Sequence, residues 1–429
     1  MAKLFWFLRR DQPLELYFYV VPKLCLGIMG YWPGPNDKRR WSAYINFVVL
    51  AVGVATELHA GFMSARCNQI SLALEILCPA FTSAVTLLKM FLMLRYRQHL
   101  YYMVAQQREL LFGSGIAGEA YEIMRKNVLM ATRFNFWPVS AGFSTCSLYI
   151  LKPLLLALLL YVQGRIDEMV WILPFNNTVP SVLLRSPYLL PTFVLSAYTG
   201  YITIFMFGGC DAYYFEFCVH TGTLFKSLQQ DVQALFQPYE GELYLPRIDG
   251  VHAAHFERAL VLLIERQNRI IELTHFFCQR YRTITLLHFV SASLVIAFGI
   301  FNLLTVGGSG LGTLLYVSYT VAALSQLLIY CYGGTLVAES SMELAVVMST
   351  CPWQLCQPRL RRYVHLFILR SQRAVTIAVP FFSPSLVTFA AVCAPLANCI
   401  LYSFPLDCWH SFQILQTSGS FIALAKSFQ

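Results

Sequence analysis

The last ten residues of this 429-residue chain carry side chains that could control the passage of ions. Ser420, Leu424, Ser427 and Phe428 follow at steps of four, three and one residue, which gathers them along one side of a helix. Bulky apolar side chains around a narrow pore exclude ions by dewetting, and a slight widening readmits water. Packing or lipid contact near a chain end favours the same residue types, so the pattern also fits a helix that lines no pore.

Motifs for enzymatic chemistry are missing from the sequence. It contains no P-loop, glycine-rich dinucleotide loop, HExxH or GxSxG pattern. The 13 cysteines are scattered, many of them in apolar stretches, without the spacing of metal ligands, so we expect small buried hydrophobic residues. We therefore predict a protein that is not an enzyme and has no metal or cofactor.

The composition is that of a membrane protein. Hydrophobic residues make up 57% of the chain and charged residues only 12%, about half the charged share of a soluble domain. Apolar runs of roughly 20 residues recur along the chain, which predicts a bundle of membrane-spanning helices. The predicted spans cover residues 42–63, 71–94, 130–161, 188–215, 252–306 and 313–337, with a seventh that starts near Phe381.

The basic residues predict an orientation. Four segments carry 24 of the 31 Lys and Arg residues, namely 1–40, 95–126, 217–283 and 339–379. Because cytoplasmic loops collect Lys and Arg, the N-terminus is predicted inside and, after seven spans, the C-terminus outside. The net charge is +9, and the way in which it is distributed fits a membrane protein better than a nucleic-acid-binding protein. The sequon at Asn176 then lies outside, as glycosylation requires. A G-protein-coupled receptor would have its N-terminus outside, and its Asp-Arg-Tyr and Asn-Pro-x-x-Tyr motifs are missing.

Four motifs follow one another in the C-terminal quarter. They are Tyr-Cys-Tyr-Gly-Gly at 330–334, Arg-Ser-Gln-Arg at 370–373, Phe-Phe-Ser-Pro-Ser-Leu-Val-Thr-Phe at 381–389 and Ile-Leu-Gln-Thr-Ser-Gly-Ser-Phe at 414–421. No single motif is specific, but their order and spacing resemble the last two spans of the insect odorant receptor family.

The resemblance implies an all-α, seven-transmembrane channel subunit with its N-terminus inside and its C-terminus outside. The co-receptor of that family has a long extra cytoplasmic segment between spans four and five, whereas this chain has only a short link at about 237–252. The resemblance thus implies an odour-tuning subunit of an odorant-gated nonselective cation channel. Such a subunit would form a heterotetramer with the co-receptor in the plasma membrane of olfactory sensory neurons. It would bind small volatile odorants, pass monovalent and divalent cations and bind no nucleic acid. A gustatory-type channel and a membrane transporter are the alternatives.

The same resemblance points to the functional residues. In the family a small apolar cavity lies in the outer half of the bundle, between spans two, three, four and six. Aromatic walls with a few hydroxyl groups suit a small volatile molecule, although aromatic residues at helical spacing are also common in a bundle core. The expected ligand-binding residues are Phe81, Phe136, Phe143, Ser147, Tyr198, Tyr201, Thr313, Tyr316 and Tyr319. Leu424 and Phe428 are expected to form the gate, with Ser427 lining the pore.

The chain departs from the family at residues 392–413, which separate the third motif from the fourth. This segment contains two prolines, which would break a helix. It begins with Val and ends with Gln, whose codons can carry the two ends of an intron, so we predict a translated, retained intron; a genuine loop is the alternative. The predicted organisation is a cytoplasmic segment with an interfacial helix (1–41), spans one to four with the ligand site (42–236), spans five and six with cytoplasmic anchor helices (237–379) and the interrupted pore helix (380–429).

Overall fold

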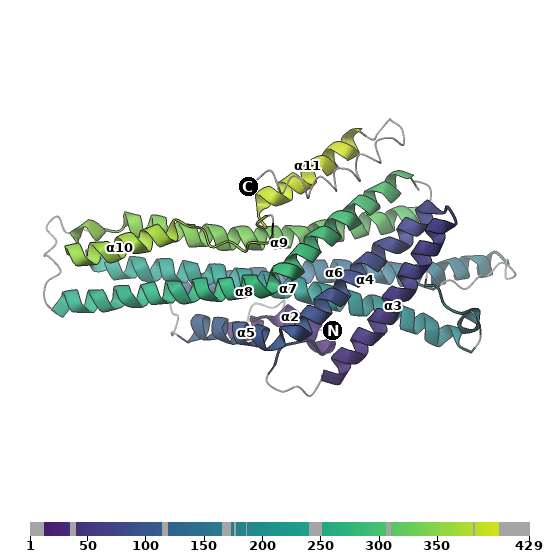
Figure 1. The fold of residues 1–429 in the computed structure, drawn as a ribbon, viewed down its shortest axis with the longest axis horizontal. Helices are drawn as coiled ribbons and strands as arrows, with labels where there is room; N and C mark the ends of the chain where they lie inside the picture. Colours follow the sequence, from purple (N-terminus) through teal and green to yellow (C-terminus); the bar gives the residue numbers. More distant parts are fainter. Residues whose placement is uncertain are drawn as a thin grey trace.

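The fold is a bundle of long helices, seen in a computed structural model (Figure 1). The structure describes residues 13–34, 40–113, 119–164, 173–175, 177–185, 187–239, 251–305, 310–380 and 382–402. Among these residues the regular secondary structure is helical, with one isolated β-bridge between Val379 and Phe382. The expected all-α fold is therefore confirmed.

Six of the described helices are long and apolar enough to cross a membrane. They are α3 (Arg40–Arg66), α4 (Ile70–Arg95), α6 (Glu119–Val162), α7 (Leu189–Phe236), α8 (Val251–Thr305) and α9 (Gly310–Thr350). These helices match the six predicted spans. Helices α6, α7 and α9 continue well beyond the predicted bounds, and α8 agrees with them to within one residue at each end. A further apolar helix, α11 (Leu386–Tyr402), follows where the seventh span was predicted. The described helices are thus those of a seven-span membrane protein.

Helix α7 is the centre of the bundle. It contacts α2 (Val20–Ile28), α3, α4, α5 (Arg97–Phe112), α6, α8 and α9. Every residue from Met206 to Phe225 is buried, because this part of α7 meets neighbours on all sides. The aromatic packing there is close, since the rings of Phe217 and Phe277 stack with centroids 3.8 Å apart.

The N-terminal segment contains a helix, which packs against the bundle. After α1 (Leu14–Tyr17), Tyr19 adopts a left-handed backbone conformation and α2 follows. The helix α2 buries Val20, Val21 and Leu26, and the hydroxyl of Tyr19 donates a hydrogen bond of 2.6 Å to Gln107 on α5.

Pro352 lies in the break between α9 and the next helix. Helix α9 ends at Thr350, a short 3-10 turn spans Trp353–Leu355, and α10 covers Pro358–Ser371. Within the Arg-Ser-Gln-Arg motif, Ser371 is buried and accepts a hydrogen bond of 2.7 Å from Gln267 on α8. The motif therefore joins α10 to the extension of span five. Figure 1 shows α8, α9 and α10 running together at this end of the molecule.

The start of α11 is fixed to α9 by close backbone packing. Gly334 of the Tyr-Cys-Tyr-Gly-Gly motif lies so near the carbonyl of Pro384 that any Cβ would collide with it. The backbone N–H of Leu386 also donates a hydrogen bond of 2.9 Å to the hydroxyl of Thr335. Beyond this junction α11 leaves the bundle at an angle to α9 (Figure 1).

One expectation about α11 is wrong. Pro395 was predicted to break the helix, but α11 continues through it to Tyr402. A proline costs its helix one hydrogen bond and some strain, and helices in membranes tolerate it where neighbouring groups satisfy the freed carbonyl. The first half of the extra segment 392–413 is thus helical, and residues 403–413 lie outside the described part of the chain.

Candidate functional site

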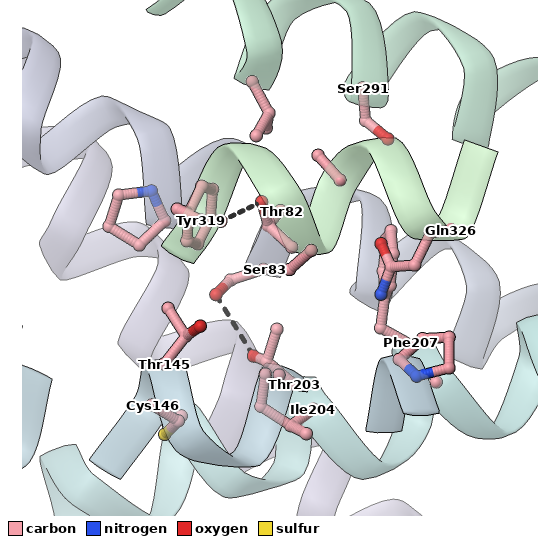
Figure 2. Close-up of a pocket in the computed structure, with 18 of the residues that line it drawn as sticks. Thr82, Ser83, Thr145, Cys146, Thr203, Ile204, Phe207, Ser291, Tyr319 and Gln326 are labelled. Carbon is pink, nitrogen blue, oxygen red and sulfur yellow. Dashed lines mark hydrogen bonds between the residues drawn. The ribbon is translucent and has the colours of Figure 1, made fainter. Parts of the chain in front are cut away.

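A cavity of about 80 Å³ lies between α4, α6, α7, α8 and α9 (Figure 2). The expected cavity between spans two, three, four and six is therefore present, and span five also contributes to its wall. Most of the lining is apolar. The polar lining residues are Thr82, Ser83, Thr145, Thr203, Ser291, Tyr319 and Gln326.

The hydroxyl groups of the cavity bond mainly to one another and to their own helices. Ser83 and Thr203 join α4 to α7 with a hydrogen bond of 3.1 Å, and Thr82 and Tyr319 join α4 to α9 with a short one (Figure 2). Thr145 donates to the backbone of its own helix. A hydroxyl that already donates keeps a lone pair that can accept, so the cavity offers a ligand a few weak polar contacts within an apolar space.

Phe175, from the connection between α6 and α7, closes one wall. Its ring stacks on Tyr149 with centroids 5.6 Å apart. It also lies over Gly200 of α7, where a Cβ would come within 2.6 Å of the ring. The absence of a side chain at residue 200 is therefore what lets this aromatic wall sit against α7.

Tyr319 is the one expected ligand-binding residue that lines the described cavity. Several others lie close by but pack against neighbours. Phe81 contacts Phe298, with ring centroids 6.0 Å apart, and Phe143 contacts Tyr201 at 5.4 Å. Tyr316 is buried in α9, three residues before Tyr319. These rings lie around the cavity without lining it.

The remaining expected residues face elsewhere. Ser147 donates to the backbone carbonyl of Phe143 on its own helix. The hydroxyl of Tyr198 donates a hydrogen bond of 2.7 Å to Asn46 on α3. Phe136 is half-buried against the main core. The side chain of Thr313, the gate residues Leu424, Ser427 and Phe428, and the sequon residue Asn176 lie outside the described part of the structure.

Small and hydroxyl-bearing residues form much of the cavity wall. Thr82, Ser83, Gly142, Gly200 and Thr203 all line the cavity. None of these residues was among the expected ligand-binding residues. Large aromatic side chains tend to fill the space between helices, whereas small ones leave it open. Glycine and threonine residues on neighbouring predicted spans would have been the better guide.

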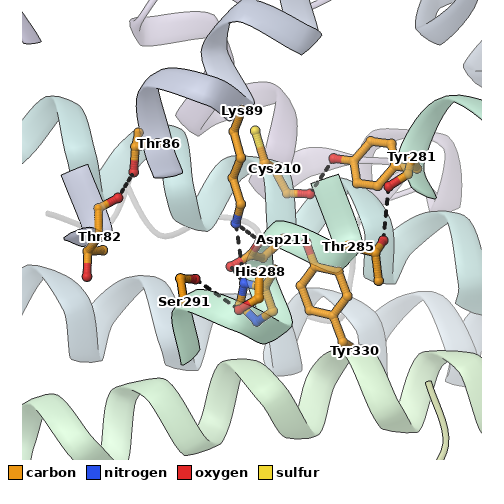
Figure 3. A network of polar contacts seen from close by, with 10 residues as sticks. All are labelled: Thr82, Thr86, Lys89, Cys210, Asp211, Tyr281, Thr285, His288, Ser291 and Tyr330. Atoms are coloured by element: carbon orange, nitrogen blue, oxygen red, sulfur yellow. Dashed lines mark hydrogen bonds and ion pairs between the residues drawn. The ribbon is translucent and has the colours of Figure 1, made fainter. Parts of the chain in front are cut away.

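Beside the cavity lies a buried polar network of Lys89, Asp211, His288 and Tyr330 (Figure 3). The ammonium group of Lys89 lies 2.6 Å from a carboxylate oxygen of Asp211, and the hydroxyl of Tyr330 donates to the same oxygen at 2.7 Å. The residues come from α4, α7, α8 and α9, so one carboxylate joins four helices. Asp211 thus pairs with its basic partner inside the bundle, where both side chains are buried.

The network reaches the cavity through Phe207. This residue lines the cavity, and the Lys89 ammonium lies 3.4 Å from the centre of its ring. Such a cation–π contact is strong where water is excluded. In the part of the chain that the structure describes, no group of three or more His, Cys, Asp or Glu side chains could hold a metal ion. Through the carboxylate of Asp211 the network links α4, α7, α8 and α9.

Comparison with known proteins places this architecture in one family. The family profile described as 7tm odorant receptor matches residues 69–394. Odorant receptor 10a of Drosophila melanogaster is 55% identical over 431 aligned positions, which cover all of both chains. The odorant receptor coreceptor of Aedes aegypti is 26% identical over 136 residues, 31% of this chain and 28% of its own length.

A solved structure shares the fold. The insect olfactory receptor OR5 from Machilis hrabei has a TM-score of 0.74 and 13% sequence identity, and the similarity covers 92% of this chain and 99% of that one. The same receptor has been solved in complex with eugenol. Together with the family profile and the full-length relative, this similarity shows that the chain belongs to the odorant receptor family and is an odorant receptor distinct from the co-receptor.

Proposed function

We propose that the cavity between α4, α6, α7, α8 and α9 is the odorant site of an odour-tuning subunit. The observation that carries this proposal is a mainly apolar cavity between five helices, whose hydroxyl groups are already bonded to the protein. Such a space gains most of its affinity from dispersion and apolar burial, and one hydrogen bond can orient the ligand. It therefore favours small volatile molecules with at most one or two polar atoms, a class to which the eugenol of the Machilis complex belongs.

The subunit would act in the plasma membrane of olfactory sensory neurons, together with the co-receptor. A tetramer of both kinds of chain would surround one pore for monovalent and divalent cations. Odorant binding can open this pore only if the ligand binds the open state more tightly than the closed one. The route by which the cavity could act on the last span is short, since Phe289 contacts both Tyr330 of the polar network and Phe382 just before α11.

Whole-cell current is the direct test of this function. Cells that express the full chain with a co-receptor should conduct within milliseconds of exposure to an active volatile from a broad panel. Cells with this chain alone should stay silent. Saturable uptake of a compound without current would instead indicate a transporter and contradict the proposal.

The proposed orientation, with the N-terminus inside, rests on the distribution of Lys and Arg. It places the turn between α3 and α4 outside, where Cys67 is exposed. A membrane-impermeant maleimide should therefore label Cys67 in intact cells, and Cys67→Ser should remove that label. Labelling of Cys67 only after permeabilisation would reverse the orientation.

Leu424 and Phe428 are proposed as the apolar gate, with Ser427 as a polar residue of the pore. Leu424→Ala should widen the narrowest point and raise the current without odorant. A closed channel at normal surface expression would count against this assignment.

The extra segment 392–413 is proposed to be a translated intron whose removal joins Ala391 to Ile414. Sequencing the messenger RNA across this junction tests the idea, since a spliced form that lacks 66 nucleotides is expected. If every transcript carries the segment, it is a genuine part of the protein. Expressing both forms side by side would show which one reaches the surface and conducts.

A further inference from the structure

A second chamber of about 220 Å³ lies next to the odorant cavity, between the start of α4, α3, α6 and the connection from α6 to α7. Pro79, Tyr149 and Phe175 line both spaces. The stacked rings of Tyr149 and Phe175 thus form a partition between the chamber and the cavity. Backbone pairing of Thr178 with Thr56, at 3.3 Å, holds the connection onto α3 beside this chamber.

Glu57 gives the chamber an unusual polar wall. This residue of α3 lines the chamber and is only 3% exposed. Its Oε2 atom has no hydrogen-bond partner among the described residues. A buried carboxyl oxygen without a partner is costly, so a ligand that supplied a hydrogen bond there would recover that cost.

The other charged groups of the chamber are already paired with each other. Lys152 of α6 lies 2.5 Å from a carboxylate oxygen of Glu75 on α4. The ammonium group therefore has a partner of its own, and Glu57 is the carboxyl group left to meet a ligand. The rest of the lining is apolar and includes Leu72, Ile76, Leu156 and Leu173.

We propose that this chamber is a second small-molecule site, which selects compounds that combine a hydroxyl group with a compact apolar body. The hydroxyl bonds to Glu57 while the apolar body packs against the leucine and isoleucine side chains. A hydroxyl both donates and accepts, so it satisfies this carboxyl group in either protonation state. The site is distinct from the odorant cavity of the proposed function, and its occupancy can be measured without opening the channel.

The test uses benzyl alcohol and ethylbenzene, which differ only in a hydroxyl group replaced by a methyl group. A cysteine introduced at Leu72, which is 37% exposed, reports on the chamber through its rate of modification by methyl methanethiosulfonate. Mass spectrometry of the peptide that contains residue 72 follows the reaction in the full chain, co-expressed with a co-receptor. Each compound is titrated to the concentration that halves the rate.

Benzyl alcohol should protect Leu72→Cys. Adding Glu57→Met should weaken protection by benzyl alcohol relative to ethylbenzene about tenfold, or about 1.4 kcal/mol. Glu122→Met changes an exposed glutamate of α6. It should leave unchanged the ratio of the concentrations at which the two compounds halve the rate of modification. The measured quantity is the ratio of the protecting concentrations of the two compounds, compared between variants. Unequal partition of the compounds into lipid affects this ratio equally in every variant and therefore cancels.

Two results would overturn the proposal. One is a failure of benzyl alcohol to protect Leu72→Cys, and the other is an unchanged ratio in Glu57→Met. If Glu57→Met does not reach the surface, Leu156→Trp takes its place, because the indole would fill the chamber and should abolish protection while Glu57 remains. Filling the odorant cavity with Ala322→Leu should spare protection at Leu72, so loss of the odorant response and loss of this site can be told apart.

Discussion

The proposed odorant cavity and the polar network lie side by side in one bundle, yet they are packed in opposite ways. Around the cavity, small residues such as Gly142, Gly200 and Thr203 leave space, and neutral hydroxyl pairs join the helices. In the network, Lys89 and Asp211 are both buried, and Tyr330 stacks on His288 with centroids 4.1 Å apart. The contrast indicates that the helices around the cavity are loosely packed, whereas the same helices are held firmly together at the network.

This division suits a receptor. A site that must admit a ligand benefits from loose packing, because filling it then costs little rearrangement. The helices around it must still move together if binding is to affect the last span. A charged pair shared by several helices supplies that connection, since separating its members in an apolar interior is expensive. The following predictions test this contrast from its strongest consequence to its weakest.

The largest effect is expected from breaking the buried ion pair. Asp211→Asn removes the charge opposite Lys89 and leaves an uncompensated ammonium inside the bundle, which should destabilise the fold by about 3–5 kcal/mol. Surface expression and thermal stability of the detergent-solubilised complex should both fall. The double variant Lys89→Met with Asp211→Asn should recover much of the loss, because no buried charge remains. A double variant no more stable than Asp211→Asn would show that the pair itself is not what matters.

Filling the cavity should affect the response and spare the fold. Ala322 is buried and lines the cavity, so Ala322→Leu places three extra carbons where the ligand would lie. The half-maximal concentration of an active volatile should rise at least about tenfold, a loss of about 1.4 kcal/mol. The matched change Ala55→Leu, at an exposed position of α3, should leave it unchanged. An equal rise of the half-maximal concentration in both variants would contradict binding of the volatile in the cavity.

A smaller effect is expected from one hydroxyl group. Tyr319→Phe removes the hydrogen bond to Thr82 at the cavity wall, and a neutral bond of this kind contributes about 1 kcal/mol. The half-maximal concentration should therefore change roughly fivefold. Tyr198→Phe is the control, because that hydroxyl bonds to Asn46 and lies away from the cavity lining. A response that depends on Tyr198 more than on Tyr319 would place the ligand elsewhere.

The same contrast explains what the sequence could predict. Long apolar runs are local features, so they predicted the six long helices, although α6, α7 and α9 continue beyond the predicted spans. Two of the C-terminal motifs lie at tight junctions, since Gly334 packs against Pro384 and Ser371 bonds to Gln267, but the motifs alone did not predict these contacts. The cavity depends instead on which residues of five helices face one another. That arrangement is set by packing between distant segments, as in the contact of Tyr319 with Thr82.

The polar network could be foreseen only in part. Asp211 within an apolar run predicts a partner of opposite charge, but Lys89 lies more than a hundred residues earlier. Nothing local in the sequence indicates that their helices are adjacent. Pro395 illustrates the reverse, because a strong local rule predicted a helix end that the surrounding structure does not require.

Odorants are proposed to bind in the cavity beside Tyr319 and Phe207. The most direct measurement is an electron cryomicroscopy structure of the full chain with its co-receptor, in the presence and absence of an active volatile. New density for the volatile should then appear between α4, α6, α7, α8 and α9, in contact with Tyr319. A cavity that looks the same in both structures, with the volatile bound elsewhere, would contradict the account.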